Sequence, residues 1–320
     1  NKKKKTYLVT GRFGYIGSAI VKKLKIQKNY EVIVFDNLSR KNRNFKKITN
    51  VKYIFGDIRK IDNLKKCFKN RIDGVIHLAY INGTSSFYKI PCDILEVGTK
   101  GIVNLLDLCI NSKVKEFYLA SSSEVYHLPK KIPTNEDESI KIPDVHNPRY
   151  SYSGGKIISE LFCVHYGKKY FKKMVIFRPH NVYGPNMGTE HVVPELIQKA
   201  KNLKKNNKII KIKGTGLETR SFIYIDDFAN AFEILLQKGK HLNIYNIGNS
   251  EQVSIKTLTK KILNILKLKA KIKSSKIAKG GTTKRCPDIK KISKIGYKKK
   301  ISLDLGLKKS IKWYYYGNKK

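Results

Sequence analysis

Short apolar runs alternate with longer amphipathic segments along the first half of the chain. The apolar runs are four or five residues long and rich in Val, Ile, Phe and Tyr, which is typical of buried strands. They lie at Tyr7–Thr10, Glu31–Phe35, Val51–Phe55, Gly74–Leu78, Glu116–Ala120 and Met174–Phe177. Helical patterns lie between them, starting near Tyr15, Ile61, Cys92 and Ser153. This alternation predicts βαβ units and an α/β fold with a parallel, doubly wound sheet.

The second half of the chain is less regular. Its helical patterns lie near His191–Leu203, Asp226–Gln237, Ile255–Leu268 and Leu305–Tyr316, and its short strands near Ile209–Ile212, Phe222–Ile225 and Ile244–Ile247. We expect a smaller α+β portion at the carboxyl edge of the sheet, where it would close a cleft. The predicted first domain is 1–180, with segments near 222–247 returning to it, and 181–320 is mainly the second domain.

A glycine-rich turn, Thr10-Gly11-Arg12-Phe13-Gly14-Tyr15-Ile16-Gly17, joins the first strand to a helix. Gly11 permits the tight turn, Gly14 lets a pyrophosphate approach the backbone, and Gly17 lets the helix sit close to the strand. The free N–H groups of the helix N-terminus favour an anion. The turn therefore predicts a Rossmann-type dinucleotide site. The other residues of the turn expected to border the cofactor are Phe13, Tyr15 and Ile16.

The second strand ends at Asp36, about 20 residues beyond the glycines, where an acid binds the adenosine ribose hydroxyls. Its charge repels a 2′-phosphate, so the sequence favours NAD over NADP. Arg40 and Arg43 lie nearby and leave NADP open as an alternative. The loops after the second, third and fourth strands supply the remaining predicted cofactor residues, Asn37, Asp57, Ile58, Leu78 and Ala79.

Tyr152-Ser153-Gly154-Gly155-Lys156 has the Tyr-x-x-x-Lys spacing, which puts an ammonium beside a phenol across one helical turn. The spacing alone is weak evidence, because the chain has 19 Tyr and many Lys, and Tyr126 and Lys130 share it. Context selects Tyr152, which opens a long helix just before the sixth strand. Tyr126 instead leads into a loop with two prolines.

The fifth strand ends in the serine cluster Ala120-Ser121-Ser122-Ser123-Glu124-Val125-Tyr126. Residues just past the carboxyl end of a parallel strand lie where α/β proteins bind ligands. A serine-rich turn without chemistry is the alternative interpretation of this segment.

The order of these motifs is that of the extended short-chain dehydrogenases/reductases. The glycine turn, the acid after the second strand, the serine cluster and Tyr-x-x-x-Lys are followed by Arg178-Pro179-His180-Asn181-Val182-Tyr183-Gly184-Pro185, by Arg220–Asp227 and by Arg285–Asp288. Over nearly its whole length the chain resembles the NAD-dependent epimerase/dehydratase family, which acts on nucleotide-sugars.

The resemblance implies a catalytic mechanism. Tyr152 would remove the proton of the sugar C4 hydroxyl while hydride passes from C4 to NAD⁺, giving a bound 4-keto sugar. Lys156 and the positive nicotinamide would lower the pKa of Tyr152. Ser122 would hydrogen-bond the same sugar oxygen and hold its geometry. The enzyme would be a nucleotide-sugar epimerase or 4,6-dehydratase, hence an isomerase or a lyase.

Glu124 bears on which branch follows the 4-keto sugar. A glutamate beside a 4-ketone can take the acidified C5 proton, as dehydration requires. By resemblance, Ser/Thr-x-Glu is typical of 4,6-dehydratases and glucuronate decarboxylases, whereas simple C4 epimerases have a small or neutral residue here. Ser123 stands where dTDP-glucose dehydratases carry an aspartate, so the pattern looks closer to GDP-mannose dehydratases and UDP-glucuronate decarboxylases. A glutamate merely paired with a surface lysine is the alternative.

The resemblance also implies a set of substrate-binding residues. Arg220 and Arg285 would bind the diphosphate or ribose with bidentate geometry, Asn181 would bind phosphate or sugar, and Ser123 would contact the substrate. The histidines have no metal-ligand spacing, so we expect no metal. A decarboxylase of the UDP-glucuronate type, a net NAD(P)H-dependent nucleotide-sugar reductase, and a non-catalytic NAD-binding or nucleic-acid-binding protein stay open as other hypotheses.

The net charge is +43, but only 9 of the 67 basic residues are Arg, and lysines run through the whole sequence. We therefore expect a solvated lysine surface that helps attract a diphosphate substrate, and neither nucleic acid nor membrane as a partner. Five scattered cysteines without a C-x-x-C pair, and no apolar membrane span or secretion signal, favour a cytoplasmic protein. Apolar faces on the helices near Cys92–Asn111 and Ser153–Phe171 resemble the dimer contact of relatives and predict a homodimer.

Overall fold

The apolar runs of the first half form one seven-stranded parallel sheet in a computed structural model that describes residues 4–40, 47–203, 208–275 and 282–317. The strand order is β11-β6-β5-β4-β1-β2-β3, and each neighbouring pair is parallel. This confirms the predicted fold class. The strands are β1 (Lys5–Thr10), β2 (Tyr30–Asp36), β3 (Val51–Phe55), β4 (Gly74–His77), β5 (Glu116–Ala120), β6 (Lys173–Pro179) and β11 (Asn243–Ile247).

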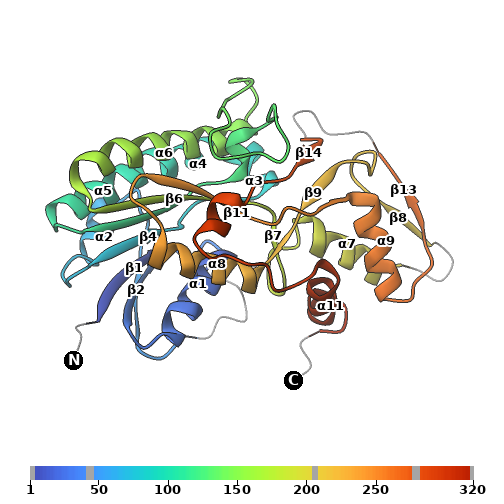
Figure 1. Cartoon of the computed structure of the whole chain (residues 1–320), viewed down its shortest axis with the longest axis horizontal. Coiled ribbons are helices and arrows are strands. Elements are labelled where there is room, and N and C mark those ends of the chain that lie inside the picture. Colours follow the sequence, from blue (N-terminus) through green and yellow to red (C-terminus); the bar gives the residue numbers. More distant parts are fainter. Residues whose placement is uncertain (1–3, 41–46, 204–207, 276–281, 318–320) are drawn as a thin grey trace.

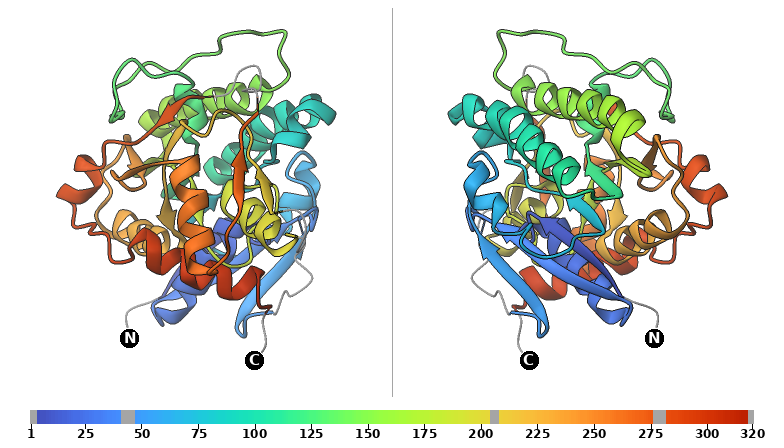
Figure 2. Two further views of the ribbon diagram at one scale, coloured as in Figure 1. Left: turned by 90° about the vertical axis from the view of Figure 1, so that its right-hand side faces the viewer. Right: turned by 90° about the vertical axis from the view of Figure 1, so that its left-hand side faces the viewer.

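Helices cover both faces of this sheet (Figure 1), which is why its strands are nearly continuous apolar runs. One face packs on α1 (Tyr15–Ile26) and α8 (Ile225–Lys238). The other packs on α5 (Ile102–Asn111) and α6 (Tyr150–Tyr170), which lie side by side in Figures 1 and 2. Successive strand residues serve opposite faces, as Leu8 and Val9 do, because side chains alternate along a strand.

The helix expected near Cys92–Asn111 consists of three continuous pieces. It starts as α4 (Pro91–Glu96), widens into the π-helical segment η1 (Val97–Gly101) and continues as α5. Two short helices precede it, α2 (Ile61–Lys65) and α3 (Thr84–Lys89). A π-helical turn within a helix is uncommon and often lies at a functional site.

The second half supplies a smaller α+β part at the carboxyl ends of the strands (Figure 1). Its core lies between α7 (Val192–Lys201), α9 (Ile255–Ile265) and α11 (Leu303–Tyr314). These helices are close to the predicted ones. Its short strands are β7 (Val182–Tyr183), β8 (Ile209–Lys211), β9 (Thr219–Ser221), β10 (Ile223–Tyr224), β12 (Gln252–Ser254), β13 (Lys271–Lys273) and β14 (Lys284–Arg285), and a short helix, α10 (Lys290–Lys294), follows them.

The chain passes between the two parts more than once. β10 pairs with β7 outside the large sheet, whereas α8 covers the sheet and β11 extends it beside β6. The residues of α8 and β11 fall within the segment 222–247 that was expected to return to the first domain. The division near residue 180 stays a prediction.

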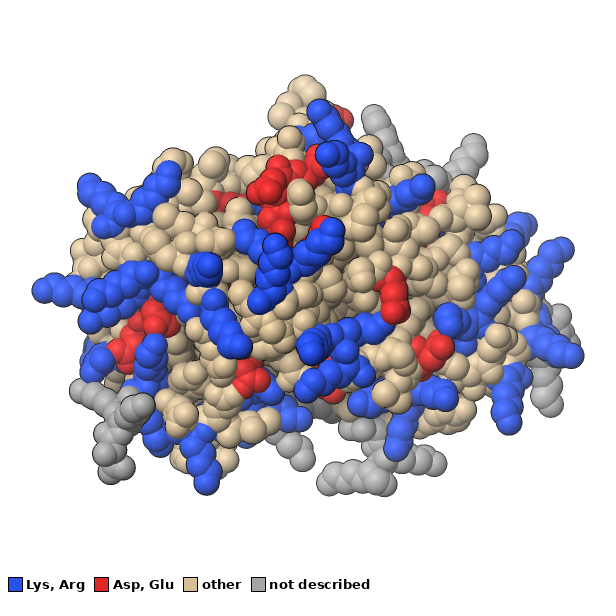
Figure 3. All heavy atoms as spheres, in the orientation of Figure 1, with Lys and Arg blue, Asp and Glu red and all other residues tan. Residues whose placement is uncertain are grey.

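Lysine and arginine side chains are spread over the whole face seen in Figure 3, over the sheet and the smaller part alike. Within the described ranges, no helix has the length and apolar character to span a bilayer. All five cysteines are free, and four of them are buried. A cytoplasmic location stays a prediction.

Candidate active site

The glycine turn forms one wall of a cleft at the carboxyl ends of the strands. Gly11 has φ +78°, and a Cβ there would lie 2.6 Å from the backbone nitrogen of Ala79. A Cβ on Gly17 would lie 2.2 Å from the Gly11 carbonyl oxygen. Both positions therefore require glycine. Gly14 precedes the first residue of α1, so the N-terminus of that helix opens toward the cleft, as a diphosphate site requires.

Asp36 ends β2 at the same wall. Its carboxylate accepts the backbone N–H groups of Phe13 and Leu38, each at 2.8 Å. Burial raises the pKa of Asp36, and these hydrogen bonds partly oppose the rise. Each oxygen keeps a lone pair free for a ribose hydroxyl. The glycine cradle and this carboxylate fit an NAD adenosine and diphosphate.

The cleft has a volume of about 330 Å³ and brings together most of the predicted cofactor residues. The exception is Phe13, whose ring packs on Tyr53 and Phe55, with centroids 6.2 and 6.1 Å away, so only its backbone supports the site. The predicted cofactor residues that line the cleft are Gly11, Gly14, Tyr15, Ile16, Gly17, Asp36, Asn37, Asp57, Ile58, Leu78, Ala79, Tyr152 and Lys156. Their individual roles toward NAD stay predictions.

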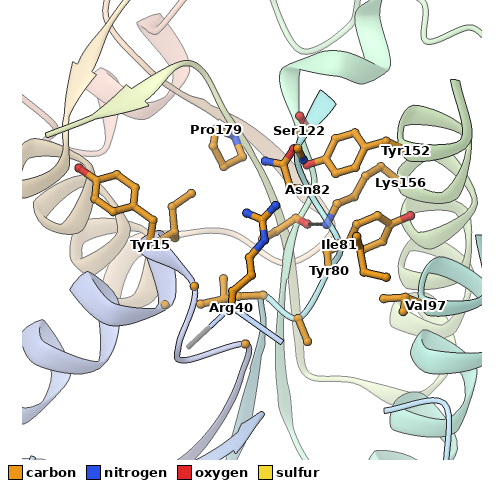
Figure 4. Close-up of a pocket in the computed structure, with 18 of the residues that line it drawn as sticks. Tyr15, Arg40, Tyr80, Ile81, Asn82, Val97, Ser122, Tyr152, Lys156 and Pro179 are labelled. Atoms are coloured by element: carbon orange, nitrogen blue, oxygen red, sulfur yellow. Dashed lines mark hydrogen bonds between the residues drawn. The ribbon is translucent and has the colours of Figure 1, made fainter. Parts of the chain in front are cut away.

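Arg40 was considered as a contact for a 2′-phosphate. In the structure its guanidinium points into the middle of the cleft, toward Ser122 (Figure 4). Burial lowers the pKa of Arg40, and the facing Tyr152 and Glu190 raise it. Arg40 therefore faces the catalytic end of the cleft. Arg43 lies outside the described residues.

Three predicted catalytic side chains meet at the carboxyl end of β5 (Figure 4). Helix α6 carries Tyr152 and Lys156 one turn apart, both toward the cleft. Ser122 precedes the 3₁₀ turn η2 (Ser123–Tyr126) and accepts the Glu124 N–H at 3.2 Å. The Ser122 hydroxyl also lies close enough to the Tyr152 phenol to lower its pKa. The Lys156 ammonium donates to the Ala120 carbonyl at 2.6 Å.

The charges in this site differ from those expected. Burial raises the pKa of Tyr152 to about 12, although the nearby Ser122 hydroxyl, Arg40 and Arg285 act in the opposite direction. Burial also lowers the pKa of Lys156 to about 7. The Lys156 ammonium lies 5.9 Å from the Tyr152 ring centroid. The structure therefore does not show the predicted lowering of the Tyr152 pKa by Lys156, because desolvation of the buried phenol raises that pKa.

Glu124 lies in the cleft wall and is ion-paired with arginines. Its Oε1 is 2.7 Å from Nη1 of Arg285, and its Oε2 is 3.9 Å from Nη2 of Arg149. Burial would raise the pKa of Glu124, but Arg285 and then Arg149 lower it to about 2. The alternative interpretation, a glutamate paired with a surface lysine, is therefore correct about the pairing but not about the partner. Glu124 pairs with arginines that lie inside the cleft.

The predicted substrate residues separate into two groups. Ser123, Asn181 and Arg285 line the cleft. Arg220 does not, and its guanidinium donates to the carbonyl oxygens of residues 219, 282 and 283. Arg220 still faces Glu124 closely enough to lower its pKa. Its contact with a substrate stays a prediction.

Several cleft residues were not predicted from the sequence. Arg149 precedes α6 and is one of only nine arginines, which was the available signal. Phe87 stacks on the Tyr152 ring at 5.0 Å and 25°, and Tyr80 meets that ring edge-on at 5.2 Å and 90°. Tyr80 directly follows Leu78 and Ala79 in the predicted cofactor loop, but no motif marks it. Glu190 and His191 enter the cleft from the segment before α7.

A buried ion pair lies beneath the serine cluster. Arg178, on β6, places Nη2 2.6 Å from Oε2 and Nε 2.9 Å from Oε1 of Glu160, on α6. The Glu160 carboxylate also accepts a hydrogen bond from Ser121. Arg178 donates to the Tyr126 hydroxyl at 2.7 Å. The pair thus connects α6, β6 and the end of β5, which carries Ser122.

Comparison with known proteins shows which family the chain belongs to. Residues 7–248 match the profile of the NAD dependent epimerase/dehydratase family. The chain belongs to this family. Membership confirms the resemblance to this family and the NAD cofactor predicted from the sequence. Among the described residues, no group of three or more His, Cys, Asp and Glu side chains could hold a metal ion.

Relatives within the family include both dehydratases and epimerases. A dTDP-D-glucose 4,6-dehydratase of Dictyostelium discoideum is 36% identical over 81% of this chain and 61% of its own length. A trifunctional UDP-glucose 4,6-dehydratase/UDP-4-keto-6-deoxy-D-glucose 3,5-epimerase/UDP-4-keto-L-rhamnose-reductase of Arabidopsis thaliana is 28% identical over 97% of this chain. The chain thus spans 61% and 47% of the lengths of these two relatives. The crystal structure of the Thermotoga maritima UDP-glucose 4-epimerase with UDP-glucose has TM-score 0.86 and 27% identity, covering 97% of this chain and 98% of that one.

Proposed function

We propose that this family member is a nucleotide-sugar epimerase or 4,6-dehydratase that works through transient oxidation of the sugar at C4. The observation that carries the proposal is the meeting of Ser122, Tyr152 and Lys156 in one cleft that also holds the glycine cradle. Similarity to a dTDP-D-glucose 4,6-dehydratase and to a UDP-glucose 4-epimerase supports a nucleotide-sugar substrate.

The first step uses three side chains. Tyr152 takes the proton of the C4 hydroxyl, and Ser122 holds that oxygen within reach of the phenol. NAD, when bound, supplies the acceptor for the hydride that leaves C4. Lys156, with a pKa of about 7, is partly protonated near neutrality. Its charge, together with that of a bound nicotinamide ring, would lower the Tyr152 pKa from about 12 and so favour the phenolate that accepts the proton. The product of this step is a 4-keto sugar.

Glu124 acts in the dehydration branch. The C4 ketone acidifies the proton on C5, and an ionised carboxylate in the cleft can accept it. The electron pair left on C5 then forms the C5–C6 double bond as the C6 hydroxyl is protonated and leaves as water. The ion pair with Arg285 makes Glu124 a weak base, because it lowers the pKa to about 2. We propose that the substrate diphosphate draws Arg285 away from Glu124. This movement would raise the basicity of the carboxylate at the moment when C5 is in place.

Decarboxylation of a nucleotide hexuronate is a second candidate, favoured by one specific observation. Arg149 and Arg285 flank Glu124, and the Arg40 guanidinium points toward the same end of the cleft (Figure 4). These cations would hold a carboxylate on C5. From the 4-keto sugar, the C5–C6 bond would break with loss of carbon dioxide. Its electron pair would pass to an enolate, and a proton would then return to C5.

We also propose a homodimer formed through α4, α5 and α6. These helices carry apolar side chains that are exposed in the single chain, Leu95 at 38% and Leu161 at 52%. Burial of such a surface is favourable. Light scattering on the purified protein tests this, and a mass of one chain would contradict it.

The reaction is tested by incubating the protein with NAD⁺ and dTDP-glucose, UDP-glucose or UDP-glucuronate in D₂O, followed by mass spectrometry. Loss of water with deuterium gained supports dehydration, and loss of carbon dioxide with deuterium gained supports decarboxylation. An isomer of unchanged mass without deuterium supports C4 epimerisation and contradicts the C5 role of Glu124. Tyr152→Phe is the control. Equal turnover by this variant would refute the proposed mechanism.

A further inference from the structure

Tyr80 contacts both Tyr152 and Lys156, the proposed base and its neighbouring cation. It follows β4 in the cleft wall, and the Lys156 ammonium sits 3.9 Å from its ring centroid. Its ring meets the Tyr152 ring at 90°, with centroids 5.2 Å apart. Figure 4 shows Lys156 and Tyr152 converging on this side of the cleft, with Tyr80 beneath the lysine.

Two glycines leave room for this side chain. A Cβ on Gly155 would lie 2.0 Å from the Tyr80 hydroxyl oxygen, and a Cβ on Gly98 would lie 2.4 Å from it. Gly155 lies inside α6, between Tyr152 and Lys156, and Gly98 lies in η1. Glycine in a helix interior is unfavourable, so its presence in two packed helical segments indicates a requirement for space.

The ring of Tyr80, rather than its hydroxyl, makes the useful contacts. In the described part of the chain, the hydroxyl oxygen is buried and has no hydrogen-bond partner. A buried hydroxyl without a partner lowers stability. Burial also raises the pKa of this phenol, so the group stays neutral and does not act as an acid or base near neutral pH. The aromatic faces and edges therefore remain as the functional part of the side chain.

We propose that Tyr80 is a positioning residue whose ring face holds the Lys156 ammonium and whose perpendicular contact with the Tyr152 ring fixes the position of that phenol. A cation over an aromatic face is attracted to the ring, so the contact favours the protonated form of Lys156. This inference rests on the proposed role of Tyr152 as the base. It concerns how the Tyr152 phenol and the Lys156 ammonium are held in fixed positions relative to each other.

Few other groups act on the same ammonium. Burial disfavours its charge, whereas Glu160 and Cys163 on α6 favour it, and the buried His77 on β4 faces it. The Glu160 carboxylate is shared with Arg178 and Ser121, so it is not free to follow Lys156. The Ala120 carbonyl accepts one of the N–H bonds. The Tyr80 ring thus stabilises the protonated form of Lys156, although the ring itself carries no net charge.

The test is the pH dependence of kcat for NAD-loaded protein, with whichever nucleotide-sugar it converts. In Tyr80→Leu the ammonium loses its ring. The limb of the profile that reports the titration of Lys156 should then move down by about 0.5 to 1 pH unit. Tyr80→Phe keeps the ring, so its profile should match that of the unaltered protein. Phe87→Leu is the matched control, because Phe87 stacks on Tyr152 while the rings near Lys156 in the described chain are Tyr80 and Tyr152.

Thermal unfolding supplies a readout that is independent of activity. Gly155→Ala should lower the Tm, because its methyl group meets the Tyr80 hydroxyl, and Tyr80→Leu in the same chain should restore it. If Tyr80→Leu does not fold, Tyr80→Met gives the same comparison, since it fills the space without an aromatic face. A Tyr80→Leu or Tyr80→Met profile that superimposes on the unaltered one overturns the inference, as does a shift of the Lys156 limb in Tyr80→Phe. Full activity of Tyr152→Phe would instead show that the proposed function has failed.

Discussion

Replacing Glu160 with glutamine tests how much its ion pair stabilises the strand ends beneath Ser122. Its carboxylate makes two hydrogen bonds to Arg178, at 2.6 and 2.9 Å, and accepts a third from Ser121. The side chains of Glu160 and Arg178 are only 4% and 3% exposed. Solvent therefore cannot replace a partner that is removed.

The variant is expected to lose stability because it removes the negative charge of Glu160 but leaves the positive charge of Arg178 buried. Glu160→Gln leaves the Arg178 charge buried with neutral acceptors, the Tyr126 hydroxyl and the residue 136 carbonyl. Removing one partner of a buried ion pair costs about 3 to 5 kcal/mol. In a chain of this size, about 2 °C of Tm is lost per kcal/mol, so we expect a decrease of about 6 to 10 °C.

The assay is thermal unfolding at one fixed NAD concentration, followed by circular dichroism. Asp62→Asn is the matched control, because it breaks an ion pair to Lys65 in which both side chains are largely exposed, 82% and 58%. Exposed pairs contribute little, so the control should unfold like the unaltered chain. Replacing Glu160 and Arg178 together by Leu and Met should recover part of the loss. If Glu160→Gln unfolds within about 2 °C of the control, the reasoning from buried charge is refuted.

Three further predictions concern the cleft. Gly11→Ala should abolish NAD binding, measured by calorimetry, because its Cβ would lie 2.6 Å from the Ala79 nitrogen; unchanged affinity would contradict the cradle. Glu124→Gln should stop deuterium entry at C5 while C4 oxidation continues, and deuterium entry at the normal rate would show another base. The pKa of Lys156 is about 7 when folded and 10.5 ordinarily, so the unfolded chain binds more protons between these pH values, and stability from this group rises with pH there. Lys156→Met should therefore reduce the gain in Tm between pH 7 and pH 10, and an equal gain in both proteins would contradict the shift.

Local sequence patterns predicted the features of the fold that depend on neighbours along the chain. The glycine turn from Gly11 to Gly17, the acid at the end of β2 and the tyrosine–lysine helix are each contained within one βαβ unit. Their periodicity and spacing therefore predict both their structure and their place at the edge of the sheet. The outer helices of the smaller part were predicted for the same reason, since amphipathic periodicity is a local property.

Contacts between distant segments were not predicted. The ion pair of Glu124 and Arg285 joins residues 161 positions apart. The sequence around either residue gives no indication that the other lies next to it in the fold. Tyr80 and Gly155 complement each other in shape only after β4 and α6 have packed. The rise in the pKa of Tyr152 depends on burial, which follows from the whole fold and opposes the simple expectation from a neighbouring lysine.

The return of α8 and β11 to the large sheet has a consequence for protein fragments. A chain ending at residue 180 would leave the β6 edge without β11 and would uncover the apolar face on which α8 packs. Unpaired strand edges and bare apolar faces promote association between chains. We therefore expect such a fragment to aggregate when expressed alone. Fragments that keep residues up to 247 would retain the complete sheet, and they are the shorter versions worth making for binding measurements with NAD.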